Sequence, residues 1–314
     1  MLKKNSKIYV AGHTGLVGSA IVRKLKKLKY TNIITIDRSN LDLTDQKKVS
    51  KFFKNKKPEF VIIAAAKVGG IFSNNNFKAD FIYQNLSIQN NLIYTSYSLG
   101  VKKLIFLGSS CVYPRNSKQP IKEDYLLSGR LEETNDAYAI AKIAGIKMCE
   151  SFNKQYNTNF ISLMPTNTFG PNDSYDDLNS HFLPALIKKI HKIKTSYNNK
   201  LVIWGNGLAK REIIYVDDIA HACIYFLKKK TKHSLINIGS GKDYTIKYYA
   251  NLLCKIISPN KKIKFVYDKS KPNGTPRKVL DIKRAKSYGW KPKSEIIESL
   301  NITYDNFVKN YKKT

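Results

Sequence analysis

The stretch Lys7-Ile-Tyr-Val-Ala-Gly-His-Thr-Gly-Leu-Val-Gly18 decides the fold that we expect for this chain. Its first part, Lys7 to Ala11, is a short apolar run typical of a buried strand, and three glycines spaced Gly-x-x-Gly-x-x-Gly follow it. Ser19 to Leu28 then reads as a helix. A strand, a glycine turn and a helix in this order can bind a dinucleotide, because the glycines admit its pyrophosphate and the helix N-terminus attracts it.

Strand-like and helical segments continue to alternate after this unit. We expect strands at 32–36, 60–66, 103–107 and 160–164, and helices at 45–54, 77–99 and around Tyr138 to Lys142. The run Phe60 to Ala66 is apolar throughout, as in a strand that is covered on both faces. The alternation predicts an α/β fold, with a doubly wound parallel Rossmann sheet and a smaller, mixed α/β C-terminal domain.

The pattern loosens after Pro171, where a polar loop begins. We therefore expect a nucleotide-binding domain at 1–170 and a substrate-binding domain at 171–314, with segments around 211–240 returning to the first. In the second domain, strands are expected at 201–204, 234–238 and 264–267, and helices at 180–192 and 245–257. No flexible linker separates the two, so we expect them to pack together.

Composition restricts the class of protein. The chain has 314 residues, of which 42% are hydrophobic, and no apolar run is long enough to cross a membrane. The N-terminus lacks the apolar region of a signal peptide, so we expect a cytoplasmic protein without membrane contact. Its four cysteines lie far apart and form no Cys-x-x-Cys pair, which predicts neither a zinc site nor a disulfide framework. We expect Cys149, Cys223 and Cys254 to be small core residues and no metal to be bound.

The net charge of +32 is unusual. The lysines are spread along the chain, and no basic cluster interleaved with aromatic residues stands out. We therefore expect no nucleic-acid partner. The positive charge suits an anionic small molecule such as a nucleotide sugar.

Two motifs carry candidate chemistry. Gly108-Ser-Ser-Cys111 follows an expected strand, and Tyr138-Ala-Ile-Ala-Lys142 lies in an expected helix. Residues four apart on a helix are separated by about 40° beyond a full turn, so the phenol and the ammonium share one side. A nearby ammonium lowers the pKa of a phenol, which could then exchange a proton with a carbonyl group. The alternative is an ordinary surface tyrosine and lysine at helical spacing.

The apolar residues of this helix suggest which side is buried. They are Ile140, Ile143, Ala144, Met148 and Phe152, and they fall opposite the pair. We therefore expect Lys142 to face away from the core. The strand at 32–36 ends at Asp37-Arg38, where an acid favours NAD and an arginine favours NADP, so the residues alone leave the coenzyme open.

Together these stretches resemble the extended short-chain dehydrogenase/reductase family, and within it the epimerase-reductases of GDP-linked keto sugars. The resemblance covers 7–290, and its most specific stretches are Ala65 to Gly70, Leu107 to Pro114, Tyr138 to Gly145, Met164 to Asn167, Asn179 to His181 and Gly274 to Lys278. It implies epimerisation of GDP-4-keto-6-deoxy-mannose at carbons 3 and 5, followed by reduction of the 4-keto group with NADPH.

The resemblance also implies catalytic roles. Ser109, Tyr138 and Lys142 would form the reductase triad, and Cys111 and His181 the acid/base pair for epimerisation. The keto group acidifies the neighbouring C–H groups, and a thiol and an imidazole both titrate near neutral pH. Which of the two acts as base stays open.

Binding residues and partners follow from the same resemblance. The NADP(H) residues would be Gly12, His13, Thr14, Gly15, Leu16, Val17, Gly18, Arg38, Ser39, Asn40, Leu41, Asp42, Leu43, Leu107, Gly108, Ser109, Ser110, Lys142, Pro165, Thr166, Asn167, Thr168 and His181. The substrate residues would be Lys189, Trp204, Arg211, Asn273 and Lys278. A homodimer is implied, with its contact formed by the helix at 77–99 and the helix that carries Tyr138.

Three residues depart from the family pattern. Thr14 and Lys189 stand where arginines are usual, and Asn273 stands for an aspartate. Thr14 removes one possible contact to a 2′-phosphate, although Arg38 still favours NADPH. Lys189 lacks the bidentate geometry of a guanidinium.

Two other hypotheses stay open. One is an NAD-dependent sugar-nucleotide 4-epimerase or dehydratase, which would share the glycines and Tyr-x-x-x-Lys but not Ser-Ser-Cys together with Asn-Ser-His. The other is a catalytically silent Rossmann-fold binding protein that uses its positive charge to contact nucleic acid.

Overall fold

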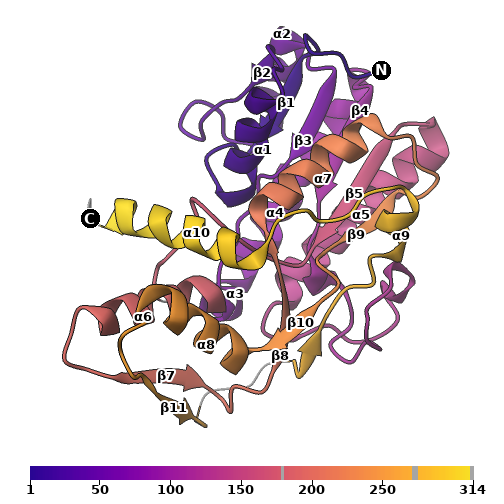
Figure 1. The fold of residues 1–314 in the computed structure, drawn as a ribbon. Coiled ribbons are helices and arrows are strands. Elements are labelled where there is room, and N and C mark those ends of the chain that lie inside the picture. The colour runs from indigo at the N-terminus through magenta and orange to yellow at the C-terminus, as the bar shows by residue number, and fades with distance from the viewer. Residues whose placement is uncertain (178–179, 271–274, 312–314) are drawn as a thin grey trace.

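The computed structural model of the protein describes residues 1–177, 180–270 and 275–311. Figure 1 shows a larger part at the top, which holds the N-terminus, and a smaller part below it, which holds α6, α8, β7 and β11. The helix α10 (Ile296–Tyr311) crosses the view between these two parts.

Six parallel strands form the sheet of the larger part, in the order β2-β1-β3-β4-β5-β9. They are β1 (Ile8–Ala11), β2 (Ile33–Ile34), β3 (Phe60–Ile63), β4 (Lys103–Leu107), β5 (Phe160–Pro165) and β9 (Leu235–Ile238). The order reverses at β1, because β2 lies on one side of it and β3 on the other. Ligands of such sheets bind beyond the carboxyl ends of the strands at the reversal. The predicted doubly wound parallel sheet is confirmed.

Helices cover both faces of this sheet. Ile8 and Val10 of β1 belong to the hydrophobic cluster of α1 (Leu16–Lys27) and α7 (Val216–Lys228). Tyr9 and Ala11 point to the other face, because side chains alternate along a strand. That face packs against α2 (Gln46–Lys56), α4 (Lys78–Ser98) and α5 (Asp136–Tyr156).

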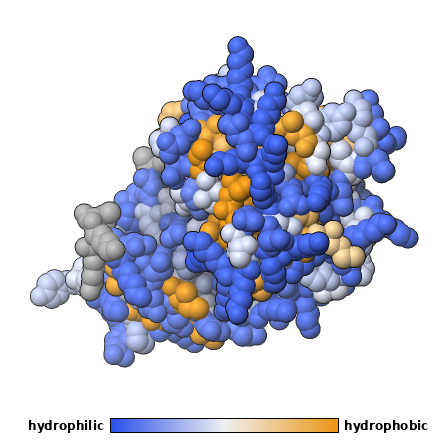
Figure 2. Space-filling view, turned by 90° about the horizontal axis from the view of Figure 1, so that it is seen from above, coloured by the Kyte–Doolittle hydropathy of each residue, from blue (hydrophilic) through white to orange (hydrophobic). Residues whose placement is uncertain are grey.

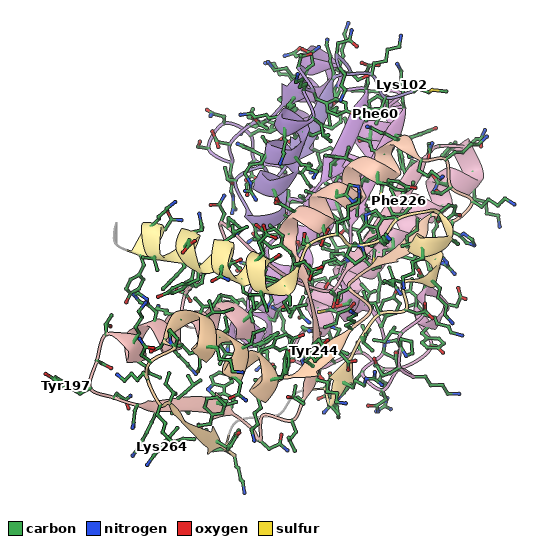
Figure 3. The ribbon with its side chains drawn as sticks, in the orientation of Figure 1. Phe60, Lys102, Tyr197, Phe226, Tyr244 and Lys264 are labelled. Carbon is green, nitrogen blue, oxygen red and sulfur yellow. The ribbon has the colours of Figure 1, made fainter. Side chains whose placement is uncertain are left out.

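Burial on both faces makes the central strands almost entirely apolar, and the buried Lys103 at the start of β4 donates a hydrogen bond to the Lys229 carbonyl oxygen at 2.6 Å. Every residue of β1, β3 and β4 is buried. Phe60 of β3 and Phe226 of α7, labelled in Figure 3, belong to the same cluster although they are far apart in sequence. The uninterrupted apolar runs of the sequence follow from this arrangement.

The smaller part combines short sheets with three helices. β7 (Lys200–Trp204) pairs in parallel with β11 (Lys264–Asp268), and β8 (Lys210–Tyr215) pairs with β6 (Asn167–Phe169), β10 (Asp243–Thr245) and β12 (Arg277–Lys278). The helices α6 (Phe182–Lys194), α8 (Ile246–Ile257) and α10 contribute to its hydrophobic core. Short helices complete the chain: α3 (Ile71–Asn76), α9 (Lys283–Ser287), η1 (Ser110–Val112) and η2 (Glu123–Tyr125).

Some elements differ from the expectations. The helix α10 and the short strands β6, β10 and β12 are not predicted from the sequence, and β3 ends at Ile63, before the expected residue 66. Within the segment 211–240, α7 and β9 lie with the larger sheet, whereas β8 belongs to the smaller part. The domain boundary after residue 170 stays a prediction.

Hydrophilic side chains dominate the surface. Figure 2 shows the face seen from above, where hydrophobic residues form only small groups among hydrophilic ones. Surface ion pairs such as Arg23 with Asp217 (3.2 Å) leave most of the positive charge unneutralised, because the chain has 55 Lys and Arg but only 23 Asp and Glu. Within the described residues, no helix combines the length and apolar composition that crossing a bilayer requires.

Candidate active site

The glycine turn joins β1 to α1 and packs tightly against the sheet. Gly12 has a φ of +80°, and a Cβ atom there would meet the Ala65 backbone nitrogen at 2.6 Å. A Cβ atom on Gly18 would meet the Gly12 carbonyl oxygen at 2.0 Å, so neither position accepts a side chain. Gly15 is the N-cap of α1, and no side chain caps this helix. The N–H groups of its first turn therefore fit the pyrophosphate of a dinucleotide.

His13 connects this turn to the loop after β2. Its Nε2 atom lies 3.4 Å from Oδ1 of Asp37. Arg38 follows in the chain and is exposed. The Arg38 guanidinium can therefore bind a 2′-phosphate. The Asp37 carboxylate would repel this phosphate, and the His13 imidazole lies beside that carboxylate.

The rest of this loop makes local contacts. Asp42 accepts hydrogen bonds from the Thr44 backbone nitrogen at 2.9 Å and from its hydroxyl at 2.8 Å. These bonds lower the pKa of Asp42. The side chain of Leu41 is buried in the core, so only its backbone can face a ligand.

Four further expected cofactor residues lie at the end of β5. Pro165 is the last residue of that strand, and the Thr166 hydroxyl and the Asn167 amide both donate to the Glu212 carbonyl oxygen, at 3.3 and 2.8 Å. The Thr168 hydroxyl donates to the Thr166 carbonyl oxygen at 3.1 Å. Residues 165–168 thus follow the carboxyl end of β5, as the glycine turn follows that of β1.

Lys142 lies inside α5 with only 3% of its surface exposed. Its ammonium donates to the Leu107 carbonyl oxygen at 2.8 Å and lies 5.8 Å from the centre of the Tyr138 ring. The predicted shared side of the two residues is confirmed. The predicted orientation away from the core is wrong, and Ile140, which we expected to be buried, is 47% exposed.

The electrostatics of the phenol also differ from the prediction. Burial raises the pKa of Tyr138, the nearby Cys111 raises it further, and a hydrogen bond with the Ser109 hydroxyl opposes both effects. Burial lowers the pKa of Lys142 to about 7. The predicted lowering of the tyrosine pKa is wrong, because desolvation dominates. A phenol that keeps its proton can donate it to a carbonyl oxygen that becomes an alkoxide.

Ser109 and Cys111 lie between β4 and this helix. The Ser109 Oγ atom accepts a hydrogen bond from the Cys111 backbone nitrogen at 3.2 Å, and Ser110 between them is buried. The Cys111 sulfur receives two donors, Asn135 Nδ2 at 3.5 Å and Lys278 Nζ at 3.6 Å. Lys278 is expected at the substrate, whereas Asn135 is not among the residues predicted for the site.

His181 is the N-cap of α6 and is accessible to solvent. Protein nevertheless surrounds much of the ring, so desolvation lowers the pKa of His181, and the Lys278 ammonium lowers it further. The lower pKa favours the neutral imidazole, which can accept a proton. Asn179, from the same motif, lies outside the described residues.

The expected substrate residues form two groups. Lys189 donates to the Val202 carbonyl oxygen at 3.2 Å and lies 5.9 Å from the Trp204 ring, which is 51% exposed. Arg211 on β8 and Lys278 on β12 are Cα partners in the smaller sheet. Asn273 lies outside the described residues.

The remaining cysteines play no part in this cluster. Cys149 and Cys223 are buried, and burial raises the pKa of each to about 12. Cys254 is only partly buried, which departs from the expected core position. Across residues 1–177, 180–270 and 275–311, no three His, Cys, Asp or Glu side chains form a group that could hold a metal ion.

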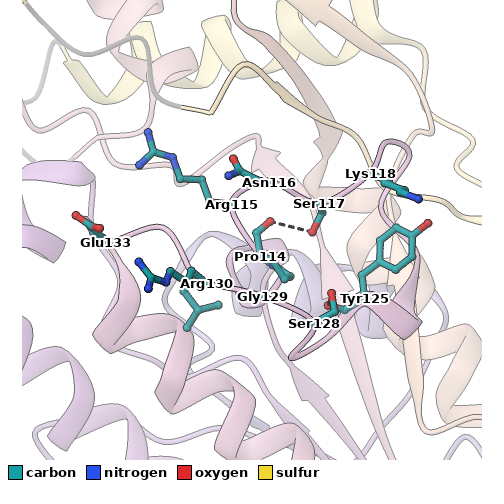
Figure 4. A pocket seen from close by; sticks show the side chains of 11 residues that line it. Pro114, Arg115, Asn116, Ser117, Lys118, Tyr125, Ser128, Gly129, Arg130 and Glu133 are labelled. Atoms are coloured by element: carbon teal, nitrogen blue, oxygen red, sulfur yellow. Dashed lines mark hydrogen bonds between the residues drawn. The ribbon is translucent and has the colours of Figure 1, made fainter.

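An open pocket of about 780 Å³ lies in the loop between Cys111 and α5. Figure 4 shows its lining, which includes Arg115, Lys118 and Arg130, together with the 2.8 Å hydrogen bond from the Ser117 hydroxyl to the Pro114 carbonyl oxygen. Among the residues that the structure describes, no expected catalytic or binding residue lines this pocket, so we do not assign it to the active site.

The sheet reversal, the glycine turn and the buried Tyr138–Lys142 pair together define a dinucleotide-dependent enzyme of the Rossmann class. A sequence profile described as the NAD dependent epimerase/dehydratase family matches residues 8–239, most of the chain. The protein belongs to this family.

Two similar proteins and one solved structure indicate a narrower group within this family. GDP-L-fucose synthase 1 of Arabidopsis thaliana is 49% identical, over 99% of this chain and 95% of its own length. GDP-L-fucose synthase of Sinorhizobium fredii is 48% identical, over 98% of each chain. The crystal structure of a GDP-L-fucose synthetase from Naegleria fowleri bound to NADP is similar with a TM-score of 0.91 at 28% identity, covering 100% of this chain and 96% of that one.

Proposed function

We propose that this protein is an NADPH-dependent GDP-L-fucose synthase, which epimerises carbons 3 and 5 of GDP-4-keto-6-deoxy-mannose and then reduces carbon 4. The observation that carries the proposal is the thiol of Cys111 beside the phenol of Tyr138, because reduction alone needs no thiol. The names of relatives that match nearly the whole chain support it.

The reduction uses the phenol and the serine hydroxyl. NADPH supplies a hydride when it is bound, and Tyr138 donates its proton to the keto oxygen. Ser109 donates a hydrogen bond to the same oxygen and stabilises the developing charge. Lys142, fixed on the Leu107 carbonyl oxygen, keeps its amino group, whose pKa burial lowers to about 7, close to the phenol.

We assign cofactor binding to the carboxyl ends of the strands of the larger sheet. The first turn of α1 and its glycines would hold the pyrophosphate, and Arg38 the 2′-phosphate. The ribose and nicotinamide would lie against Leu107 to Ser110, Lys142, Pro165 to Thr168 and His181.

Epimerisation uses the acid/base pair. One of Cys111 and His181 removes the proton next to the keto group, and the other returns a proton from the opposite face. The enolate that forms between these steps keeps its oxygen on the Ser109 and Tyr138 hydroxyls. Lys189, Arg211 and Trp204 would hold the GDP moiety, the cations at its phosphates and the indole at an apolar surface.

The direct test combines the protein with NADPH and GDP-4-keto-6-deoxy-mannose. We expect net oxidation of NADPH and GDP-L-fucose as the product identified by NMR. Interconversion at carbon 4 without net oxidation would instead identify an NAD-dependent 4-epimerase or dehydratase. Absence of any turnover, together with tight and steeply salt-dependent binding to nucleic acid, would identify a silent binding protein.

Tyr138→Phe tests the role of the phenol. We expect reduction to slow by about 10²- to 10⁴-fold, because the proton donor is lost. The dissociation constant of NADPH, measured by fluorescence titration, should stay within about twofold, since the ring itself remains. Loss of NADPH binding would show that Tyr138 is mainly structural.

The proposal includes a homodimer in the cytoplasm. Tyr83 and Tyr94 on α4 and Ile140 on α5 expose 70%, 49% and 47% of their surface, which supports a contact through these helices. NADPH and nucleotide sugars are metabolites of the cytoplasm, which supports that compartment.

A further inference from the structure

The sulfur of Cys111 has two N–H donors that come from distant parts of the chain. Asn135 immediately precedes α5, and Lys278 is the last residue of β12. Their nitrogen atoms lie 3.5 and 3.6 Å from Sγ. Cys111 itself lies in η1 after β4, so three separate elements converge on one sulfur atom. Reduction of a carbonyl group gives no reason for this arrangement.

We propose that Asn135 and Lys278 are positioning residues for the Cys111 thiol, and that Lys278 serves proton transfer at the sugar rather than binding of the nucleotide phosphates. This inference rests on the proposed function, in which Cys111 exchanges a proton with a sugar carbon. One group takes the C–H proton and leaves an enolate, and the other returns a proton to the same carbon, so no proton is gained or lost overall. The sulfur is an anion either before or after its own transfer, and an adjacent ammonium stabilises that anion.

The pairing of β12 with β8 shows that Lys278 differs from its neighbouring cation. Lys278 is the Cα partner of Arg211, so both side chains leave the sheet side by side. The Arg211 guanidinium donates to the carbonyl oxygens of Thr275 at 2.5 Å and Lys210 at 2.9 Å. Lys278 instead directs its ammonium to the sulfur. Two adjacent cations therefore have different targets.

The same ammonium acts on the second member of the acid/base pair. After burial, Lys278 is the cause that lowers the pKa of His181. A cation near both groups keeps the imidazole neutral and offsets the charge of a thiolate. One lysine therefore acts on both members of the pair.

Asn135 contributes geometry without charge. It is the N-cap of α5, yet its side chain makes no capping hydrogen bond and reaches the sulfur instead. Among the described residues, its Oδ1 atom is buried and has no hydrogen-bond partner. A buried amide oxygen requires a donor, and a sugar hydroxyl bound beside the thiol would supply it.

The first experiment needs no substrate. The rate at which iodoacetamide alkylates Cys111 is followed by mass spectrometry of its peptide. Loss of the cation in Lys278→Met should slow alkylation about tenfold, and Lys278→Arg should restore most of the rate. Asn135→Ala should slow it about threefold, whereas the exposed Lys283→Met should match the wild type. Unchanged rates in both Lys278→Met and Asn135→Ala would overturn the proposal.

The second experiment separates proton transfer from phosphate binding. We expect Lys278→Met to slow solvent-deuterium incorporation into the sugar about 100-fold, while calorimetry shows GDP affinity within about twofold of wild type. Lys189→Met should show the reverse pattern. A tenfold or greater loss of GDP affinity in Lys278→Met, with alkylation unchanged, would make Lys278 a phosphate ligand.

These outcomes also distinguish the two proposals. If the wild-type protein incorporates no deuterium, the proposed function fails, whereas the alkylation rates still decide whether the donor pair acts on the sulfur. If Lys278→Met does not fold, Lys278→Gln, which also removes the charge, and Asn135→Ala carry the same comparison.

Discussion

The Asp37 carboxylate lies 3.4 Å from the His13 imidazole and next in sequence to Arg38. In the proposed complex it would repel the 2′-phosphate that Arg38 attracts. Asp37→Asn should therefore tighten NADPH binding about three- to tenfold, the size expected for one solvent-exposed charge near a phosphate. NADH binding should not tighten, because a ribose hydroxyl carries no charge. Fluorescence titration of the protein with each coenzyme measures both constants.

His13→Ala is the complementary change. It leaves the Asp37 carboxylate without its partner, so NADPH should bind more weakly while NADH changes little. If Asp37→Asn left the ratio of the two dissociation constants unchanged, this acid would have no role in coenzyme choice.

Residue spacing predicted which groups meet but not how deeply they lie. The four-residue separation of Tyr138 and Lys142 correctly placed them on one side of α5. The stripe of large apolar residues gave a wrong prediction of the buried side of α5, because small residues lie on that side. One of them is Gly145, where a Cβ atom would meet Phe106 at 2.5 Å. Small residues add little to a hydrophobic stripe, yet they bring the helix close enough to the sheet to bury Lys142. Asn135 could not be predicted, since an asparagine before a helix is usually read as a cap.

At the level of elements, the central strands were predictable and the short ones were not. β1, β3, β4 and β5 are buried on both faces, so each leaves an apolar run in the sequence. β12 has two residues and β10 three, too few to show a period of two. The helix α10 was not predicted, although its sequence carries apolar residues at helical spacing. Of these, Leu300, Tyr304 and Phe307 are buried.

Glu212 shows how one strand holds the two parts of the molecule together. It lies in β8 and is fully buried, and its carboxylate accepts hydrogen bonds from the backbone nitrogens of Gly241 at 2.6 Å and Leu280 at 2.8 Å. These residues follow β9 of the larger sheet and β12 of the smaller one. Burial raises the pKa of Glu212 from 4.5 to about 7, against the opposing effect of these bonds.

This shift predicts a pH-dependent stability. Because the folded pKa is the higher one, the folded protein keeps the proton between about pH 4.5 and pH 7, while the unfolded chain releases it. The group therefore lowers the free energy of unfolding as the pH rises through this window, by about 3 kcal/mol in total. Glu212→Gln cannot ionise, so its stability relative to wild type should improve by a similar amount between pH 5 and pH 8.

Urea denaturation at four pH values measures this difference directly. The variant should carry a constant penalty of about 1–3 kcal/mol, because an amide has only one acceptor oxygen for the two backbone donors. Asp173, whose pKa burial also raises to about 7, is present in both proteins and cancels in the comparison. If the free energies of unfolding of the two proteins changed in parallel with pH, Glu212 would ionise in the folded protein without loss of stability.

The whole molecule assembles the site from both of its parts. Cys111 and Tyr138 belong to the loops and helices of the larger sheet, whereas Lys278 and Arg211 come from the smaller one. The contact of Lys278 with Cys111 therefore requires the two parts to be packed together. The dispersed positive charge is consistent with this arrangement, because the cations gathered at the site suit an anionic substrate without forming a basic stripe for nucleic acid.

The proposed homodimer is the property of the whole molecule that a single substitution tests best. Ile140 is 47% exposed on α5, and the neighbouring helix α4 exposes Tyr83 and Tyr94. Ile140→Glu would bury a carboxylate in the contact of these helices, which costs several kcal/mol when it is unpaired. Light scattering after gel filtration should give twice the 35.9 kDa of one chain for wild type and 35.9 kDa for the variant.

Ile297→Glu is the matched control, because Ile297 on α10 is 56% exposed and lies outside the proposed contact. A wild-type mass of 35.9 kDa, or a variant that keeps the double mass, would exclude a dimer held by α4 and α5.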